Sequence, residues 1–255
     1  MYVKFNSIVL ESKILMKSVL TIKPTYSKPY NVHIGINILE KVINELENIA
    51  GSDRIVVCTQ EVLKNHELVV KFLEDLKSSF KVEFIVLPNG EEVKNIDVVL
   101  NLVEKFYKLK IDKGTPIVAI GGGALGDAIG FLSSIYMRGL PLVLVPTTLL
   151  SMIDSAIGGK NAVNMYGIKN LIGTFYQPSI VIEELNFLKT LPEREYKSGI
   201  AEAIKYGLAL DRELYRLISE NYVKILNRDS KTLLELITRC VACKGKIVES
   251  EKKIK

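Results

Sequence analysis

Short apolar runs and segments with helical periodicity alternate along the first 185 residues of the chain. Continuous apolar runs of strand length predict buried strands, which we place at residues 54–59, 80–88, 115–120, 141–148 and 179–185. Apolar residues at helical spacing predict the intervening helices, which we place at residues 37–49, 62–79, 93–110 and 127–137. This alternation predicts an α/β fold in which helices cover a parallel sheet.

Helical patterns replace strand patterns after Pro192 and continue to Lys255. The change predicts a boundary between an α/β domain at residues 1–187 and a helical domain that begins in residues 188–255. Residues 151–178 combine glycines with polar residues, which is typical of a shaped loop or hairpin.

Composition and charge narrow the class of protein. Of the 255 residues, 48% are hydrophobic and 25% are charged, as in ordinary soluble globular proteins. The net charge of +5 is spread along the chain without a long basic block, which does not favour a nucleic-acid partner. It suits a small anionic substrate if some of the lysines converge.

Targeting signals and membrane spans are not expected. No apolar run reaches the length of about 18–20 residues that a membrane-spanning helix needs. Charges interrupt the N-terminal stretch MYVKFNSIVLESKILMK, so it lacks the apolar core of a signal peptide. We therefore expect a cytoplasmic protein.

Cysteines and histidines are scarce. Cys58 stands alone, and Cys240 and Cys243 form a single CxxC in a helical stretch, where we expect them on one helix face. A zinc ribbon would need a second such pair. The two histidines, His33 and His66, both lie in the N-terminal part of the chain.

The glycine cluster GGGALGD, at residues 121–127, follows an expected strand and opens an expected helix. Gly121, Gly123 and Gly126 fit the pattern G-x-G-x-x-G, which lets backbone N–H groups approach a phosphate at a helix N-terminus. A tight turn with close strand–helix packing is the simpler interpretation, and we rank nucleotide phosphate binding ahead of it. The acidic residue that usually follows about 20 positions later is missing, and Glu91 is our candidate to hold the ribose instead.

Two further stretches carry polar groups in apolar surroundings. Asp154, Lys160 and Lys169 lie in DSAIGGKNAVN and GIKNLIG, where lysines can act as donors to phosphate or carboxylate. Arg138 in YMRG could bind an oxyanion through two N–H groups, although an isolated arginine is more often a surface residue. In GIAEAIKYG, Glu202 and Lys205 share a helix face, as a surface ion pair or as part of a reaction centre.

Seven motifs carry a family resemblance when they are taken in order. GGGALGD, YMRG, VPTTLL, IDSAIGGK, GIKNLIGTFYQP, LKTLPERE and GIAEAIKYG follow one another as in 3-dehydroquinate synthases. The chain resembles this family from Pro88 to about Gly207, and more weakly through CKGKIVESE. The resemblance implies a Rossmann-like NAD-binding domain followed by an α-helical C-terminal domain.

The resemblance also implies an activity. The expected substrate is 3-deoxy-D-arabino-heptulosonate 7-phosphate, which is converted to 3-dehydroquinate and phosphate in the shikimate pathway of aromatic amino acid biosynthesis. NAD takes a hydride from C5 and later returns it, phosphate is eliminated between these steps, and an intramolecular aldol step closes the ring. Zinc, or cobalt in its place, polarises the C5 oxygen.

Positions that match the family motifs receive roles by the same resemblance. Matches to the NAD site are Asn89, Gly90, Glu91, Lys94, Gly123, Ala124, Leu125, Gly126, Asp127, Thr147, Thr148, Lys160, Lys169, Phe187, Leu188, Lys189 and Thr190. Matches to catalytic and substrate positions are Asp154, Lys160, Asn170, Lys205, Lys244 and Arg138. Arg138 matches an arginine that reaches the phosphate from a neighbouring subunit, so a homodimer is expected.

The metal site implied by the resemblance extends beyond this sequence. Glu202 matches the first zinc ligand, and the other two ligands of the family are histidines in motifs that lie downstream of CKGKIVESE. His33 and His66 match neither motif. We therefore expect the chain to lack the C-terminal part of a synthase.

Other interpretations stay open at this point. One is a related sugar-phosphate cyclase that acts on a different phosphate, and another is a module that holds NAD without catalysing a reaction. A metal-dependent polyol dehydrogenase is a further alternative, against which IDSAIGGK and YMRG speak.

Overall fold

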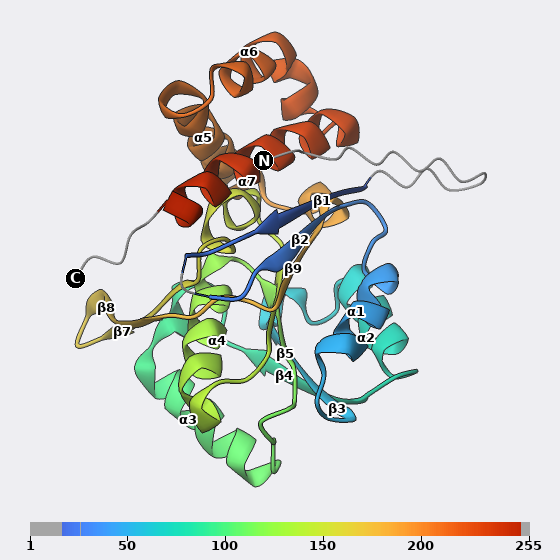
Figure 1. The fold of residues 1–255 in the computed structure, drawn as a ribbon, viewed down its shortest axis with the longest axis vertical. Coiled ribbons are helices and arrows are strands. Elements are labelled where there is room, and N and C mark those ends of the chain that lie inside the picture. Colours follow the sequence, from blue (N-terminus) through green and yellow to red (C-terminus); the bar gives the residue numbers. More distant parts are fainter. Residues whose placement is uncertain (1–16, 26, 251–255) are drawn as a thin grey trace.

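The computed structural model describes residues 17–25 and 27–250. Its centre is a seven-stranded sheet in the order β1-β2-β9-β6-β5-β3-β4, in which β1 is antiparallel to β2 and every other neighbouring pair is parallel (Figure 1). The strands are β1 Lys17–Ile22, β2 Tyr30–Gly35, β3 Arg54–Gln60, β4 Lys81–Leu87, β5 Ile117–Gly121, β6 Leu142–Pro146 and β9 Ile180–Glu184. The predicted α/β fold with a mostly parallel sheet is confirmed.

Helices cover both faces of the sheet. The helices α1 Ile43–Ile49 and α2 Glu67–Leu76 share one apolar cluster with the sheet. The helices α3 Ile96–Lys108 and α4 Gly123–Ile135 belong to the cluster on the other face. Strands β5, β6 and β9 are buried at every position, which explains their continuous apolar runs.

The two N-terminal strands were not predicted. β1 and β2 carry polar residues such as Thr21, Asn31 and His33, which interrupt the apolar runs that identify the later strands. The glycine cluster therefore follows the fifth strand of the chain, not the third as our sequence-based count has it. Residues 1–16, which hold most of the stretch used to judge a signal peptide, lie outside the described residues.

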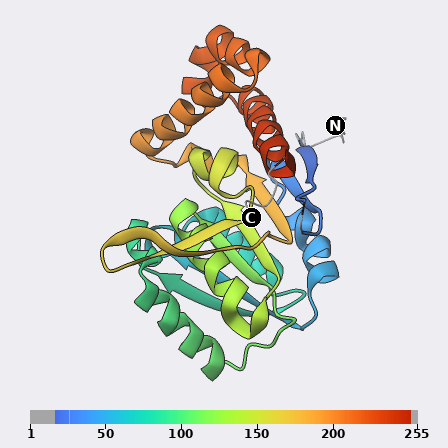
Figure 2. The same cartoon turned by 60° about the vertical axis from the view of Figure 1, so that its left-hand side comes forward.

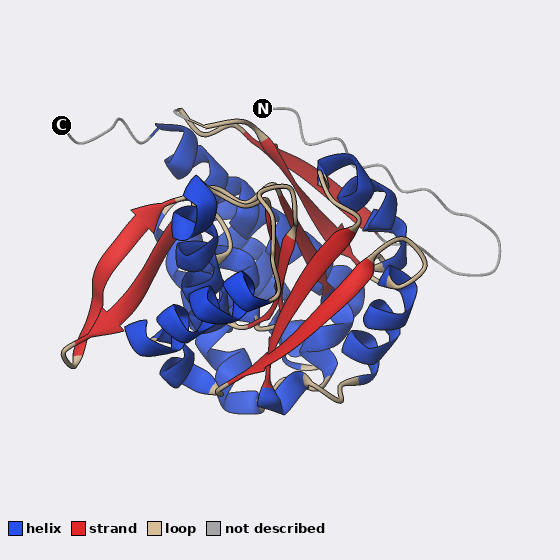
Figure 3. Cartoon of the chain, turned by 90° about the horizontal axis from the view of Figure 1, so that it is seen from below, coloured by secondary structure: helices blue, strands red, loops and turns tan. Residues whose placement is uncertain are grey.

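The region at residues 151–178 contains a hairpin, in agreement with one of the two predicted forms. After a π-helical turn at Ser151–Ser155, β7 Lys160–Met165 pairs with β8 Ile168–Phe175 and projects beside the main sheet (Figure 3). Tyr166 and Gly167 connect the strands with φ values of 55° and 74°, as a two-residue hairpin turn of type I′ requires.

The last three helices, α5 Glu193–Ala209, α6 Arg212–Leu226 and α7 Ser230–Ser250, lie together at one end of the molecule (Figure 2). α7 also packs on β1, where Gly245 lies against Ile22. The proposed domain boundary at residues 187/188 falls in the 3₁₀ helix Leu185–Lys189 between β9 and α5. It stays a prediction.

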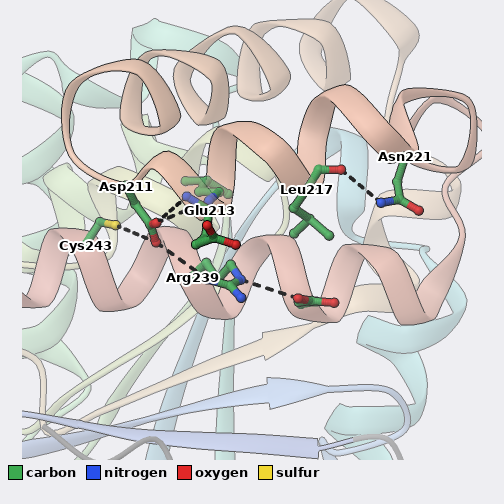
Figure 4. A network of polar contacts seen from close by, with 8 residues as sticks. Asp211, Glu213, Leu217, Asn221, Arg239 and Cys243 are labelled. Atoms are coloured by element: carbon green, nitrogen blue, oxygen red, sulfur yellow. Dashed lines mark hydrogen bonds and ion pairs between the residues drawn. The ribbon is translucent and has the colours of Figure 1, made fainter.

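A polar network joins α6 to α7 (Figure 4). Asp211 accepts hydrogen bonds from the backbone N–H groups of Glu213 and Leu214 at 3.0 and 3.2 Å, so it caps the N-terminus of α6. Its other oxygen lies 3.8 Å from Arg239 and 3.9 Å from the Cys243 sulfur. Cys240 and Cys243 are free thiols buried on α7, as the sequence predicts for a CxxC on one helix face.

Candidate active site

The carboxyl ends of the parallel strands bring most of the predicted residues to one edge of the sheet. The segments that follow β4, β5, β6 and β9 carry the residues matched to the cofactor site. Strands β3 and β5 are neighbours, but the chain proceeds from β3 to β4 on the other side, so the direction of winding changes between β3 and β5. Open α/β sheets bind ligands at such a switch point.

The glycine turn presents an uncapped helix N-terminus at this edge. The N-cap of α4 is Gly122, which has no side chain to accept a hydrogen bond from the first turn. The first N–H groups of a helix have no partner within it, and the helix dipole favours an anion there. A Cβ atom on Gly123 would lie 2.6 Å from the Ser155 hydroxyl, so a side chain at this position would have to displace Ser155.

The residues after β6 pack directly against this turn. The backbone N–H of Thr147 donates to the carbonyl of Gly121 at 2.9 Å. Thr148 and Ser151 are joined through their hydroxyls at 2.8 Å. Thr147 and Thr148 therefore lie beside the glycine turn.

Lys94 links the cofactor-matched segments to the hairpin. Its ammonium group donates to Asp127 at 2.6 Å and to the amide oxygen of Asn170 at 2.5 Å. Lys94 is 4% exposed, which is unusual for a lysine and requires such partners. Burial raises the pKa of Asp127, and the Lys94 ammonium opposes part of that rise.

Glu91 contacts the hairpin as well. It accepts a hydrogen bond from the Asn164 side chain at 2.9 Å and lies 4.0 Å from the Lys169 ammonium. Asn164 in turn accepts from the backbone N–H of Asn170 at 2.9 Å. The side chain of Asn89 accepts from the backbone N–H of Val62, so it links the segment after β4 to the segment after β3.

Asp154 is the centre of a second polar cluster. Its Oδ1 atom accepts hydrogen bonds from the Tyr206 hydroxyl at 2.6 Å and from the Lys244 ammonium at 2.7 Å. Burial raises the pKa of Asp154, but the hydrogen bonds from Lys244 and Tyr206 outweigh it and bring the pKa below its usual value. Three segments that lie far apart in the sequence thus hold one ionised carboxylate.

Glu202 and Lys205 form an ion pair of 2.6 Å on α5, with side chains 18% and 67% exposed. In the described part of the chain, residues 17–25 and 27–250, no three histidine, cysteine, aspartate or glutamate side chains are grouped to hold a metal ion. His33 lies 2.8 Å from Glu45, and His66 contacts Thr190. The residues described here therefore offer Glu202 as one possible ligand and do not form a metal site by themselves.

The segment after β9 holds two buried and two exposed residues that match the cofactor site. The side chains of Phe187 and Leu188 are buried in the two apolar clusters, whereas Lys189 and Thr190 are exposed. The Thr190 hydroxyl lies 2.9 Å from Nε2 of His66, which follows β3. His66 thus lies beside cofactor-matched residues, although no sequence motif indicates it.

Arg138 lies apart from the other predicted residues. It follows α4, whose N-terminus is at the carboxyl edge of the sheet, and precedes β6, which starts at the opposite edge. A helix of 13 residues is about 20 Å long, so Arg138 does not join the cluster at Asp154 within one chain. Lys160 begins β7, close in sequence to Asp154.

Sequence reasoning missed Tyr206 and Asn164. Tyr206 lies in GIAEAIKYG, where an aromatic residue at helical spacing is typical of a core position. Asn164 carries no motif, and its role follows from the fold of the hairpin.

The fold and this edge define a Rossmann-like α/β protein with an attached helical segment. The chain belongs to the 3-dehydroquinate synthase family: the profile for 3-dehydroquinate synthase N-terminal matches residues 84–198, and that for 3-dehydroquinate synthase C-terminal matches residues 199–254.

Among curated relatives, the 3-dehydroquinate synthase of Saccharolobus solfataricus is 52% identical over 170 residues, which is 67% of this chain and 48% of the relative. That of Sulfurisphaera tokodaii is 41% identical over 217 residues, 82% of this chain and 61% of the relative. The chain thus spans about half to three fifths of the length of these relatives.

Solved structures of related cyclases share the fold. A 2-deoxy-scyllo-inosose synthase complexed with carbaglucose-6-phosphate, NAD⁺ and Co²⁺ gives a TM-score of 0.83 at 27% identity, covering 91% of this chain and 62% of that one. A 2-epi-5-epi-valiolone synthase from Streptomyces hygroscopicus with NAD⁺ and Zn²⁺ bound gives 0.75 at 27% identity, covering 89% and 62%.

Proposed function

We propose that this chain carries out, or forms the cofactor-binding part of, the 3-dehydroquinate synthase reaction. In this reaction 3-deoxy-D-arabino-heptulosonate 7-phosphate yields 3-dehydroquinate and phosphate. The observation that carries the proposal is the ionised Asp154 held by Tyr206 and Lys244 near an uncapped, glycine-lined helix N-terminus. It occurs in a chain of the synthase family.

The edge of the sheet fits NAD. The N-terminus of α4, with Gly123 to Asp127, would receive the pyrophosphate, and Glu91 would accept hydrogen bonds from a ribose. When bound, NAD⁺ supplies the reversible acceptance of a hydride. Lys94 would keep Asp127 and Asn170 in fixed positions beside it, because one buried ammonium binds both.

The charged side chains suit a substrate with a carboxylate and a phosphate. Lys160, Lys205 and Lys244 would act as donors to these groups, since ammonium groups bind phosphate as point charges. Asp154 is ionised at neutral pH and would accept a hydrogen bond from a substrate hydroxyl. These are the tasks that this chain's own residues would perform during phosphate elimination.

A divalent metal is part of the proposal, but the described residues do not form a complete site for it. Two related cyclases were solved with Co²⁺ and Zn²⁺. The described residues place Glu202 as one candidate ligand but no group of three. Because a catalytic zinc normally has three protein ligands, we assign no reaction step to a metal here.

A homodimer in the cytoplasm completes the proposal. Arg138 is exposed and lies away from Asp154, which suits a residue that acts in a neighbouring subunit. Large apolar side chains on β8 and on the segment after α4 are also exposed, among them Phe175 at 79% and Met137 at 50%. Among residues 17–25 and 27–250, no helix is long and apolar enough to cross a membrane.

The direct test is phosphate release from the expected substrate with added NAD⁺ and Co²⁺ or Zn²⁺, alongside calorimetric NAD⁺ binding. Formation of 3-dehydroquinate with phosphate supports the proposal. NAD⁺ binding without phosphate release would favour the binding-module alternative. Turnover of another sugar phosphate in a substrate panel would assign the chain to a different cyclase activity.

A further inference from the structure

Two donors of different character meet at one oxygen of Asp154. The Tyr206 hydroxyl comes from α5 and the Lys244 ammonium from α7, at 2.6 and 2.7 Å from Oδ1. Charge alone does not require both, because one ammonium group already balances one carboxylate. The Tyr206 hydroxyl adds a directional hydrogen bond to the carboxylate without adding charge.

The backbone holds Tyr206 firmly. Tyr206 lies near the end of α5, and its carbonyl accepts the N–H groups of Leu210 and Asp211 at 2.8 and 3.2 Å. At the next position, a Cβ atom on Gly207 would lie 2.9 Å from the backbone of Tyr215, so α5 and α6 touch closely here. The tyrosine is 4% exposed, and its side chain has two rotatable bonds.

Asp154 needs such support because its own segment is irregular. It lies in the π-helical turn Ser151–Ser155, where Ala156 donates to the carbonyl of Ser151 at 3.0 Å. Lys244 reaches Asp154 on a flexible four-carbon stem. In the proposed reaction the same ammonium also donates to the substrate, so substrate binding competes with Asp154 for the position of this side chain.

We propose that Tyr206 is a positioning residue for this reaction, whose hydroxyl keeps the Asp154 carboxylate in place when Lys244 turns to the substrate. The inference rests on the proposed function. Burial, followed by the hydrogen bond to Asp154, raises the pKa of Tyr206, so the phenol remains a donor throughout the neutral range. The other charged groups that act on Asp154 are Lys205 on α5 and Asp127 on α4.

The test compares Tyr206→Phe with Tyr196→Phe. Tyr196 is a matched control on the same helix: it is 2% exposed, and its hydroxyl donates to the carbonyl of Ile225 at 2.6 Å, away from Asp154. Carboxyl-¹³C NMR follows the titration of Asp154, and the Asp154→Asn variant identifies its signal. We expect the pKa of Asp154 to rise in Tyr206→Phe, which has lost a donor to the charged form, and to stay unchanged in Tyr196→Phe.

Turnover provides the second measurement. Tyr206→Phe should lower kcat about tenfold with KM changed less than about twofold, as expected for loss of one hydrogen bond that matters in the transition state. An unchanged Asp154 titration, or an unchanged kcat, would overturn the inference. If Tyr206→Phe fails to fold, 3-fluorotyrosine incorporated at position 206 should lower the pKa of Asp154, because its phenol is a stronger donor.

The design separates the two proposals. The NMR titration needs no turnover, so it decides whether Tyr206 controls Asp154 even in an inactive preparation. An unmodified protein that binds the substrate without releasing phosphate would overturn catalysis by this chain and the catalytic part of this inference. Normal turnover in Tyr206→Phe would overturn this inference alone.

Discussion

At the scale of single residues, Glu183 on β9 is a buried acid. Its side chain is 0% exposed, and neither carboxyl oxygen has a hydrogen-bond partner among the residues that the structure describes. Glu183 is in register with Ile34 of β2, in the layer that α7 covers. Burial raises the pKa of Glu183 well above its ordinary value, so the folded protein retains this proton to a higher pH than the unfolded chain does.

This burial predicts a loss of stability with rising pH. Above the unfolded-state pKa of Glu183, about 4.5, the unfolded chain releases the proton while the folded protein retains it, so the free energy of unfolding falls up to the folded-state pKa. Glu183→Gln should flatten this dependence and stabilise the protein by at least about 1 kcal/mol at pH 8. Urea unfolding between pH 5 and 8 measures both.

The neighbouring Glu184 is the matched control. It is also buried, but it accepts hydrogen bonds from the N–H groups of Ile38 and Asn186 at 2.8 and 3.1 Å. Glu184→Gln should therefore destabilise the protein, by about 1 kcal/mol. Equal effects of the two substitutions would contradict the account of Glu183.

Substitution of the buried Lys94 should destabilise the protein, whereas Glu183→Gln should stabilise it. Lys94→Met leaves the Asp127 carboxylate buried without its ammonium partner, which should cost about 3 kcal/mol of stability. Adding Asp127→Asn to Lys94→Met should recover part of that loss, since the unpaired charge is then absent. Denaturant unfolding of the single and double variants measures the coupling, and strictly additive losses would show that the pair is not coupled.

At the scale of elements, the sequence predicts best where burial is continuous. Strands β5, β6 and β9 are buried on both faces and were located within a few residues from their apolar runs. β1 and β2 were missed, because a partly exposed strand and one that contains His33 lack such runs.

The residues of the candidate site also divide into those that sequence motifs identify and those that only the fold reveals. Residues in glycine-rich or lysine-bearing motifs, such as Gly123 and Lys160, could be selected from the sequence. Tyr206 could not, because its partner Asp154 lies 52 residues away and only the packing of α5 against the segment after β6 brings them together.

The contact between α4 and β7 gives a prediction about stability at the scale of elements. A Cβ atom on Gly130 would lie 1.9 Å from Oδ1 of Asn161, whose amide donates to the carbonyls of Gly159 and Tyr176. Gly130→Ala should therefore displace the start of the hairpin and cost about 2 kcal/mol of stability.

Gly126→Ala on the same helix is the control for this prediction. There a Cβ atom has room, at 3.9 Å from Leu144, so the change should leave stability equal or raise it by about 0.5–1 kcal/mol through helix propensity. Thermal unfolding of both variants checks the difference. Comparable stability of the two would show that the hairpin tolerates displacement.

At the scale of the whole molecule, the separation of Arg138 from Asp154 within one chain gives a test of the proposed homodimer. If each site combines Lys160 of one chain with Arg138 of the other, Arg138→Ala and Lys160→Ala should each abolish phosphate release. A hybrid dimer of the two variants regains one complete site, since one chain supplies the intact lysine and its partner supplies the intact arginine. Random reassociation of equal amounts makes half of the dimers hybrid, so the mixture should recover about a quarter of the normal activity.

The same mixture distinguishes a shared site from a self-contained one. When both residues serve the same chain's site, every site in a hybrid dimer carries one substitution, and mixing restores nothing. Mixing Arg138→Ala with unmodified protein controls for dilution and exchange of subunits, and light scattering confirms the mass of a dimer. Recovery in the hybrid would assign Arg138 to the neighbouring subunit's site and explain why its position in one chain is so far from the residues it is expected to serve.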